Sequence, residues 1–349
     1  MNKLNTLLAG SAALLVAFAG PLRAEDKPAK PWYENVKLSG LAFGDAYSVA
    51  GHHNPLIEDQ NGFWLRRVYL TFDYTIDEKW STRMRLEANS PGDFVTNAKL
   101  DPFVKDAYLA YKNQGHELYL GISPSPSFDL VESFWGQRPV EKTPVDLYRA
   151  GSARDFGVAY RGKSASGKFA IHAMLGNGSA EGAETNEGKK AMVSLSFRPS
   201  EATVFELYGD FEDRPASTDR TTFGAFAGFK AKKGRFGLQY FTQDRDVAGG
   251  ATQTLSVGSA FGVVELAPKY NLILRYDRSF DGNPEADKIP YLVLAKNFEF
   301  DLALVGVEYK LAKKISLTPN VEFVTYRDTS GVAAPDDDVF GKLTLFFQF

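Results

Sequence analysis

The chain has 349 residues, of which 40 are Lys or Arg and 43 are Asp or Glu, and its formal net charge is −3. This balance lacks the basic signature of a nucleic-acid-binding protein, so we expect no nucleic-acid partner. Cysteine is absent, which excludes disulfides and a cysteine nucleophile. With 31 glycines and 13% aromatic residues, the composition favours many strands and tight turns over a helical protein.

Residues 1–24 have the pattern of an export signal. Lys3 supplies a positive start, residues 7–19 form an apolar core, and Leu22-Arg23-Ala24 is a suitable cleavage site. This core is shorter than the ~20 residues of a membrane-spanning helix, and no later stretch qualifies either. We therefore predict a signal peptide over 1–24, a charged periplasmic leader over 25–34 and one folded domain over 35–349.

From residue 35 onward, polar and apolar residues alternate with a period of two, which is typical of strands. In the clearest segment, 80–89, Arg83, Arg85 and Glu87 fall on one face, and Met84 and Leu86 fall on the other. One face of such a strand meets water and the other meets hydrocarbon or a core. The pattern predicts sixteen strands, over residues 35–49, 63–76, 80–89, 103–112, 117–122, 154–160, 168–176, 190–198, 203–213, 221–230, 235–245, 253–265, 270–280, 300–310, 315–327 and 341–349.

The connections between these segments also alternate in length. Those after even-numbered strands are short turns, and those after odd-numbered strands are mostly longer. An even strand count with this alternation is typical of a bacterial outer-membrane barrel. The alternative is a soluble array of β-sandwiches, whose outer faces should be polar. A continuous aliphatic and aromatic face opposite a face of arginine and glutamate favours the membrane barrel.

Residues 123–151 interrupt the pattern with four prolines, mixed charge and the bulky aromatics Phe128, Phe134 and Trp135. Proline removes donors from a sheet, and structureless loops of this length are usually functional or disordered. The aromatic residues argue against disorder. We therefore predict a loop folded into the mouth of the barrel, narrowing it, with an ordinary surface loop as the alternative. A second long connection, 281–298, contains the apolar run 289–295, whose contacts the sequence leaves open.

The final segment places Leu343, Leu345 and Phe347 on one face and ends on Phe349. It resembles the closing strand of outer-membrane proteins, whose terminal aromatic residue is part of the signal for the barrel-assembly machinery. Aromatic residues also gather beside the short turns, where an interfacial girdle would lie: Trp80, Tyr111, Tyr160, Phe236, Tyr270 and Tyr309.

Four blocks resemble the phosphate-selective porin O and P family. They are Phe63-Trp64-Leu65-Arg66-Arg67-Val68-Tyr69-Leu70, Leu118-Tyr119-Leu120-Gly121-Ile122-Ser123-Pro124, Ala153-Arg154-Asp155-Phe156-Gly157-Val158-Ala159-Tyr160 and Leu175-Gly176-Asn177-Gly178. The resemblance covers about the first half of the chain and implies a sixteen-stranded, usually homotrimeric, passive channel with an inward-folded loop after the fifth strand. A barrel in the outer membrane would contact lipid and lipopolysaccharide. Family members that take up phosphate line the pore with an arginine ladder, whereas here Asp73 and Glu87 stand between the arginines.

A pore selects by its diameter and by the charge at its narrowest point. Our candidates on the wall are Arg67, Arg83, Arg85 and Glu87, and our candidates on the loop are Asp129, Glu132, Arg138 and Arg149. The alternative is that these are ordinary residues of a polar lumen. Arg66 should face away from Arg67, toward lipid and the phosphates of lipopolysaccharide, unless a bulge shifts the register.

We expect no catalytic residues, no metal site and no cofactor. His52-His53 and Asp336-Asp337-Asp338 could contact a cation, but both runs read as solvated loops. Nucleophilic catalysis needs a nucleophile beside a base, and the four histidines show no such arrangement.

The predicted function is an outer-membrane porin of a Gram-negative bacterium. It would give passive diffusion of small hydrophilic solutes or ions, with a weak anion preference. The alternative is a non-transport barrel, either a scaffold that holds a partner such as an electron-carrying cytochrome, or an adhesin. That alternative predicts a lumen without the inward loop.

Overall fold

The computed structural model describes residues 31–329 and 331–349. The predicted signal peptide and residues 25–30 of the predicted leader lie outside this part of the chain. At the start of the described chain, Trp32–Asn35 form a short 3-10 helix, η1. Within the described residues, no helix has the length and apolar character needed to cross a bilayer.

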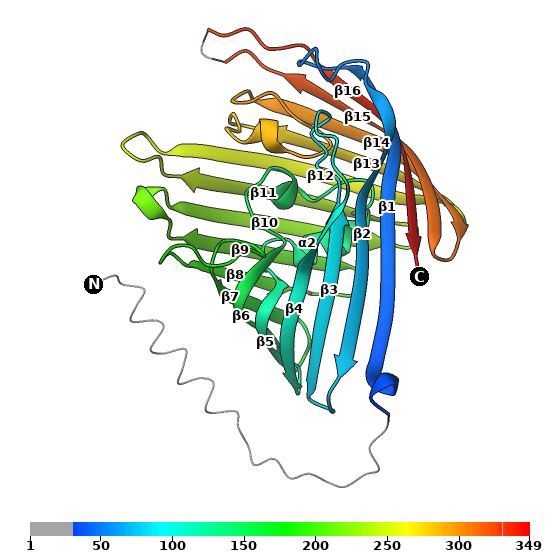
Figure 1. Ribbon diagram of the computed structural model, residues 1–349, viewed down its shortest axis with the longest axis vertical. Coiled ribbons are helices and arrows are strands. Elements are labelled where there is room, and N and C mark those ends of the chain that lie inside the picture. The colour runs from blue at the N-terminus through cyan, green and yellow to red at the C-terminus, as the bar shows by residue number, and fades with distance from the viewer. Residues whose placement is uncertain (1–30, 330) are drawn as a thin grey trace. The chain divides into compact units, whose positions relative to one another are not determined.

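Sixteen strands follow, which confirms the predicted number and, within a few residues, their positions (Figure 1). Each strand pairs antiparallel with its sequence neighbour, and the sheet closes into a barrel. The strands are β1 (Val36–Gly51), β2 (Asn61–Thr75), β3 (Trp80–Asn89), β4 (Asp101–Asn113), β5 (His116–Pro124), β6 (Arg154–Lys163), β7 (Phe169–Gly176), β8 (Lys190–Phe197), β9 (Thr203–Glu212), β10 (Arg220–Ala231), β11 (Gly234–Arg245), β12 (Gln253–Ala267), β13 (Tyr270–Ser279), β14 (Phe300–Ala312), β15 (Ile315–Tyr326) and β16 (Asp338–Gln348).

The barrel is closed by the pairing of β1 with β16, and the last residue of the chain takes part. The N–H and carbonyl groups of Gly40 and Phe349 form two hydrogen bonds of 3.0 Å each. The Phe349 ring lies over Gly40, where an added Cβ would come within 2.1 Å of the ring. Glycine is therefore needed at position 40 so that the terminal ring can lie against the backbone of the first strand.

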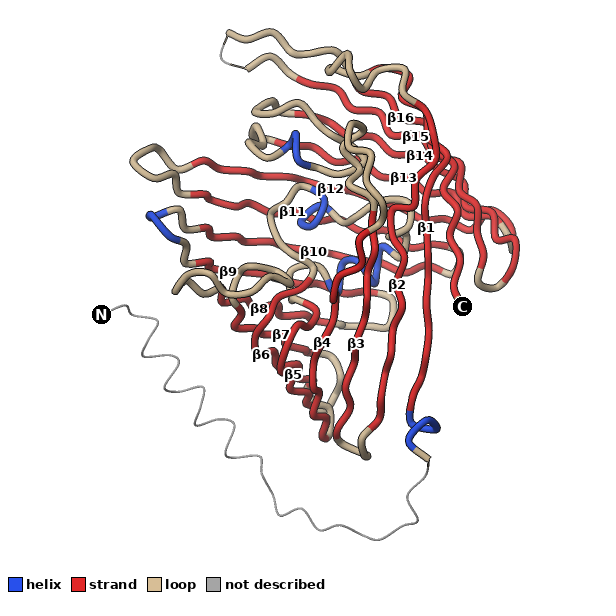
Figure 2. The backbone as a smooth tube through the Cα atoms, viewed as in Figure 1, coloured by secondary structure: helices blue, strands red, loops and turns tan. Residues whose placement is uncertain are grey.

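The connections have the predicted alternation in length (Figure 2). The short ones, such as 114–115 and 232–233, follow even-numbered strands, and the long ones follow odd-numbered strands. The longest, 125–153, contains the helices α2 (Asp129–Trp135) and α3 (Pro144–Leu147). Two further 3-10 helices are η2 (Pro215–Ser217) and η3 (Ala286–Lys288), in the connections that follow β9 and β13.

The alternation of polar and apolar residues in the sequence corresponds to the inner and outer faces of the barrel wall. In β16, Lys342 and Thr344 are buried while Leu343 and Leu345 are exposed, as the sequence predicts. Exposed apolar side chains recur on the outer face of the other strands, where hydrocarbon would cover them: Leu207, Phe223, Leu238, Tyr240, Leu274, Tyr276, Val305 and Val321.

The alternation breaks in β2, and there the expected orientation of Arg66 is wrong. Both Arg66 and Arg67 are buried, with exposed fractions of 2% and 8%, so neither side chain faces lipid. A second irregularity lies between β3 and β4, where the register shifts after Arg85. Between β3 and β4, the extra residue Lys105 resets which positions face the lumen, so Lys105 and Asp106 both face inward.

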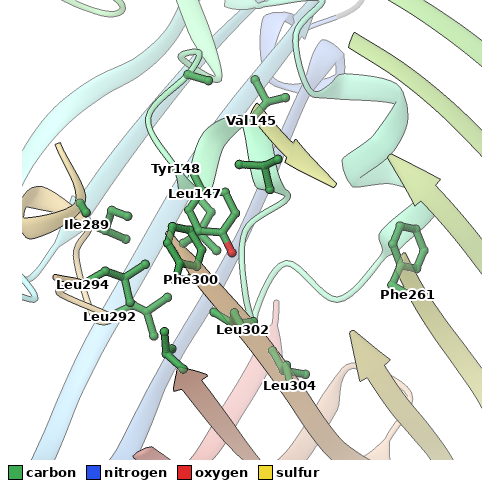
Figure 3. Close-up of a cluster of buried hydrophobic side chains, with 14 of the residues drawn as sticks. Val145, Leu147, Tyr148, Phe261, Ile289, Leu292, Leu294, Phe300, Leu302 and Leu304 are labelled. Carbon is green, nitrogen blue, oxygen red and sulfur yellow. The ribbon is translucent and has the colours of Figure 1, made fainter. Parts of the chain in front are cut away.

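The inside of the barrel is only partly polar. Two long connections, 125–153 and 280–299, pack their apolar side chains against apolar residues of β10 to β15 and form an internal hydrophobic core. Figure 3 shows Leu147 and Tyr148 beside Phe300, with Leu292 and Leu294 close by. The apolar run 289–295, whose contacts the sequence leaves open, therefore belongs to this core. Inward apolar positions on these strands are stable because the connections cover them and exclude water.

Candidate functional site

The connection between β5 and β6 packs against β10 and β12 through the aromatic end of α2. Phe134 contacts Phe226 of β10 edge to face, with ring centroids 5.4 Å apart, and Trp135 contacts Phe261 of β12 at 4.9 Å. Gly228 makes room for this packing, since an added Cβ would lie 2.8 Å from the Phe134 ring. These aromatic residues, which argue against disorder in the sequence, are buried here.

The C-terminal end of α2 is bound by the guanidinium of Arg235. Gly136 ends the helix in the left-handed conformation, with φ of 62°. The carbonyl oxygen of Trp135 accepts hydrogen bonds from Nε and Nη2 of Arg235, at 3.0 and 2.7 Å. A cation at this end also complements the partial negative charge of the last carbonyl groups.

Around α3, the connection is bound to β11, β13 and the start of the β13–β14 connection. The Tyr148 hydroxyl donates to Asp277 Oδ2 at 2.6 Å, and the Tyr148 carbonyl accepts from Asn283 Nδ2 at 3.0 Å. Gln243 Nε2 donates to the Ala150 carbonyl at 2.6 Å. Each of these strand residues is buried and belongs to the inner face.

Between the two helices, the same connection is bound to β2. Arg66 Nη2 donates to the carbonyl oxygens of Pro139 and Val140, at 2.6 and 2.7 Å. The Arg66 guanidinium also pairs with Asp45 at 2.8 Å and with Glu141 at 3.5 Å. Arg66 is thus an anchor for the connection rather than a ligand for lipid phosphates.

A cavity of about 530 Å³ lies beside this connection. Strands β1 to β4 and β14 to β16 form its walls together with the start of β6, α2, α3 and the residues between the two helices. Six basic and four acidic side chains line it: Arg67, Arg85, Lys105, Arg138, Lys142, Arg154, Asp129, Glu132, Asp146 and Glu308.

The structure brings five of the eight predicted site residues to this cavity, namely Arg67, Arg85, Asp129, Glu132 and Arg138. The other three are placed differently. Glu87 is fully buried behind Arg67, with which it forms an ion pair, and Arg83 pairs with Asp73 at 2.7 Å outside the cavity lining. Arg149 is exposed and reaches the Lys288 carbonyl at 3.4 Å.

Charges of both signs line the cavity, and most of them are paired. Arg85 lies 3.2 Å from Asp106, and Arg138 lies 3.1 Å from Glu132. Arg138 also lies 3.7 Å from Asp146. A fixed arrangement of paired charges produces a local field inside the cavity while keeping each side chain in place.

Sequence reasoning missed five of the basic and acidic residues that line the cavity: Lys105, Lys142, Asp146, Arg154 and Glu308. Lys105 faces inward because of the register shift between β3 and β4, and the sequence carries no clear signal for that shift. Lys142, just before α3, and Asp146, within it, are four positions apart and form an ion pair of 3.2 Å. That spacing is typical of an ion pair and was the available signal.

The charges around Asp146 determine its protonation. Burial by itself would raise the pKa of the Asp146 carboxyl, but Lys142, Arg138 and Arg67 outweigh burial and lower the pKa. Burial lowers the pKa of Lys142, and Asp146 opposes that effect. Asp146 therefore stays ionised at neutral pH and places a fixed negative charge among the arginines.

A second cluster lies at the end of β1, where His52 and His53 meet Asp338 of β16. The sequence reads the histidine pair and the acidic run as separate solvated loops. In the structure, His52 and Asp338 are both buried, and the ligand atoms of the three residues lie within 4.8 Å of one another. This cluster is separate from the charged cavity, since none of its residues lines that cavity.

Solved porin structures resemble this fold. An anion-selective porin from Comamonas acidovorans is 13% identical, with a TM-score of 0.65, and the match covers 90% of this chain and 99% of that one. The outer-membrane channel DcaP of Acinetobacter baumannii is 16% identical, with a TM-score of 0.64 and coverage of 90% and 97%. The trimer form of OmpT from Vibrio cholerae is 15% identical, with a TM-score of 0.60 and coverage of 90% and 99%.

At these identities the likeness concerns the fold. No curated protein matches the chain. The sequence itself matches the profile of the Gram-negative porin family over residues 11–330, which is most of its length. Together with the closed sixteen-stranded barrel, this match shows that the chain belongs to the Gram-negative porin family and forms an outer-membrane channel.

Proposed function

We propose that the β5–β6 connection narrows the channel and that small hydrophilic solutes or ions pass through the charged cavity beside it. The main support for this proposal is that the β5–β6 connection is attached to the barrel wall on two sides. Arg66 holds it to β2, and Asp277 and Gln243 hold it to β13 and β11. In the closed strand order, β2 and β11 lie nearly opposite each other. A segment attached on both sides of the barrel crosses its interior.

The charge of the cavity lining favours a weak preference for anions. Six basic side chains face four acidic ones, so the lining carries a small positive excess. Of the predicted selectivity residues, we propose that Arg67, Arg85 and Arg138 act on the passing ion, together with the acidic side chains Asp129 and Glu132. Opposed charges favour polar solutes and disfavour apolar ones, because only polar solutes gain from a local field.

Reconstitution in planar bilayers tests the proposal. The purified protein should insert with stepwise increases in conductance in potassium chloride. A salt gradient across the bilayer should give a reversal potential of the sign that indicates anion preference. Absence of conductance steps from protein whose circular dichroism shows intact β structure would refute channel activity. A reversal potential of the opposite sign would refute the anion preference alone.

Within the porin family, we propose a relationship with the phosphate-selective O and P porins. This finer assignment is supported by the four sequence blocks, of which Ala153-Arg154 contributes an arginine to the cavity lining. Phosphate at millimolar concentration should then reduce chloride conductance, because the larger anion occupies the same basic lining. Chloride conductance that is insensitive to phosphate would place the chain with general porins.

We also propose that the channel is a homotrimer in contact with outer-membrane lipid and lipopolysaccharide, and that Phe349 takes part in recognition by the barrel-assembly machinery. The trimer form of OmpT, a fold relative, supports the oligomeric state. Light scattering of the detergent-solubilised protein, corrected for bound detergent, measures the number of chains. A mass of one chain would contradict the trimer.

The alternative of a scaffold or adhesin is less consistent with the interior. A barrel that holds a threaded partner needs an open lumen, whereas here connections 125–153 and 280–299 bury apolar side chains inside it. Absorbance in the Soret region of the purified protein would support a cytochrome partner, and its absence together with stepwise conductance would favour the porin.

A further inference from the structure

Three potential metal ligands from opposite ends of the chain meet at the seam of the barrel, which is the place where β1 pairs with β16. His52 and His53 directly follow β1, and Asp338 is the first residue of β16, 285 positions after His53. His53 Nδ1 lies 2.9 Å from Asp338 Oδ1, and His52 Nδ1 lies 3.9 Å from the same oxygen. The two imidazole rings are stacked, with centroids 4.3 Å apart.

His52 is oriented by a second contact that fixes its tautomer. Its Nε2 lies 3.1 Å from the carbonyl oxygen of Val293, which can only accept a hydrogen bond. Nε2 therefore carries the proton, and Nδ1, which lies 3.9 Å from Asp338 Oδ1, has a lone pair that an ion could use by displacing the hydrogen bond it now accepts. In the absence of an ion, the Asn54 N–H donates to that lone pair at 2.9 Å. A backbone carbonyl behind a ligand histidine is the usual support in metal sites.

Asp338 is held in the same way. Its side chain is fully buried, and its Oδ2 accepts a hydrogen bond from the Tyr326 hydroxyl. Its Oδ1 accepts from the His53 N–H at 2.7 Å and faces both histidine rings. The carboxylate is thus aimed into the cluster by groups outside it, and the His53 side chain, 15% exposed, leaves a route for an ion.

We propose that His52, His53 and Asp338 bind a divalent transition-metal ion, with Zn²⁺ as the reference ion. Two imidazole nitrogens and one carboxylate oxygen are ligands that Zn²⁺ favours, at bond lengths of about 2.0–2.2 Å. In a tetrahedral site these lengths put ligand atoms about 3.4 Å apart, between the two nitrogen–oxygen distances in the structure. Ca²⁺ and Mg²⁺ prefer oxygen ligands and fit the set less well. Water completes the coordination.

Such an ion would join three parts of the molecule that are distant in sequence. It would connect the end of β1 to the start of β16 and, through His52 and the Val293 carbonyl, to the β13–β14 connection in the barrel interior. The ion would therefore strengthen the seam at which the barrel closes. This role is independent of the solute that the channel carries, so the site is a regulator of stability rather than part of the selective lining.

The test uses untagged protein in detergent, titrated with Zn²⁺ by calorimetry and with Co²⁺ by visible absorption. We expect one saturable site per chain, d–d bands of a nitrogen- and oxygen-ligated Co²⁺, and a higher unfolding temperature in Zn²⁺ than in EDTA. H53A should weaken Zn²⁺ binding at least tenfold and remove the thermal shift. D338N, which keeps the shape of the side chain, should do the same.

The matched control is H116A, because His116 bonds to Tyr160 beside a short turn and is not part of the cluster. It should leave both the Zn²⁺ affinity and the thermal shift unchanged. Absence of saturable binding to the wild-type protein would overturn the proposal. Wild-type affinity in H53A and D338N would overturn it too, since the ion would then bind elsewhere.

Discussion

The hydroxyl of Tyr148 donates a 2.6 Å hydrogen bond to Asp277, and the two residues are 129 positions apart in the chain. Both side chains are fully buried. Asp277 also forms an ion pair with Arg275, whose guanidinium donates to the Lys142 carbonyl. One strand, β13, thus binds the β5–β6 connection at two points, and the connection is held to the wall as a structured element.

Removing the Tyr148 hydroxyl should loosen this attachment. Y148F keeps the ring against Phe300 but removes one of the hydrogen bonds to the buried Asp277 carboxylate, which keeps those from Arg275. We expect a cost of about 1–3 kcal/mol and a lower unfolding temperature in detergent. Single-channel recordings should show more frequent current fluctuations. Recordings as quiet as those of the wild type would mean that this bond does not restrain the connection.

Removing the Trp135 side chain should widen the channel. Trp135 is fully buried against Phe261, and its indole N–H donates to the Glu141 carbonyl at 2.9 Å. W135A should cost about 3–5 kcal/mol at this site and raise single-channel conductance, because the end of α2 loses its anchor. W80A is the control, since Trp80 contacts Tyr111 beside a short turn. It should leave conductance unchanged, and an equal increase in both variants would argue against a specific role.

Neutralising an arginine that lines the cavity should reduce the anion preference of the channel more than neutralising one outside it. A unit charge about 4 Å from a passing ion contributes about 1 kcal/mol in water, so R85Q and R138Q should each lower the anion-to-cation permeability ratio by up to about fivefold. R83Q is the comparison, because Arg83 pairs with Asp73 away from the cavity lining. Reversal potentials measure the ratio. Equal shifts in all three variants would show that the lumen acts through its total charge.

The β13–β14 connection should lose stability in acid. Burial raises the pKa of Glu285, but Arg220, Arg245 and Arg149 outweigh burial and lower it. Because the folded-state pKa is lowered, the stabilisation is complete above the unfolded value of about 4.3 and is lost as the pH falls through the folded value. E285Q should therefore lower the unfolding temperature at pH 7, by an effect on the order of 1 kcal/mol, and its difference from the wild type should shrink as the pH falls below the unfolded value.

One result of the comparison between E285Q and the wild type would contradict this prediction. A difference between E285Q and the wild type that persists unchanged at pH 3 would show that the side chain acts through packing. Its ion pairs, at 3.4 Å to Arg220 and 3.3 Å to Arg245, would then contribute little.

The alternation of polar and apolar residues was sufficient to predict which side chains of most strands face into the barrel and which face out. Lys342 and Leu343 face opposite sides because successive residues of a strand alternate, and that rule needs only the sequence. It failed at Arg66, which is buried beside Arg67, and it gave no sign of the bulge that turns Lys105 inward. The alternation also gave no sign that Leu302 and Leu304 face inward. An apolar residue covered by a connection inside the barrel looks the same in the sequence as one that faces lipid.

The sequence by itself determined the number of strands, the alternation of short and long connections and most of the outward face. Each of these depends on residues next to one another in the chain and on whether they meet water or hydrocarbon. Only the tertiary structure decided which strands hold the β5–β6 connection and that His53 meets Asp338. Those contacts depend on barrel closure, which brings β1 beside β16 and places β2 across from β11, and no local pattern encodes the distance across the barrel.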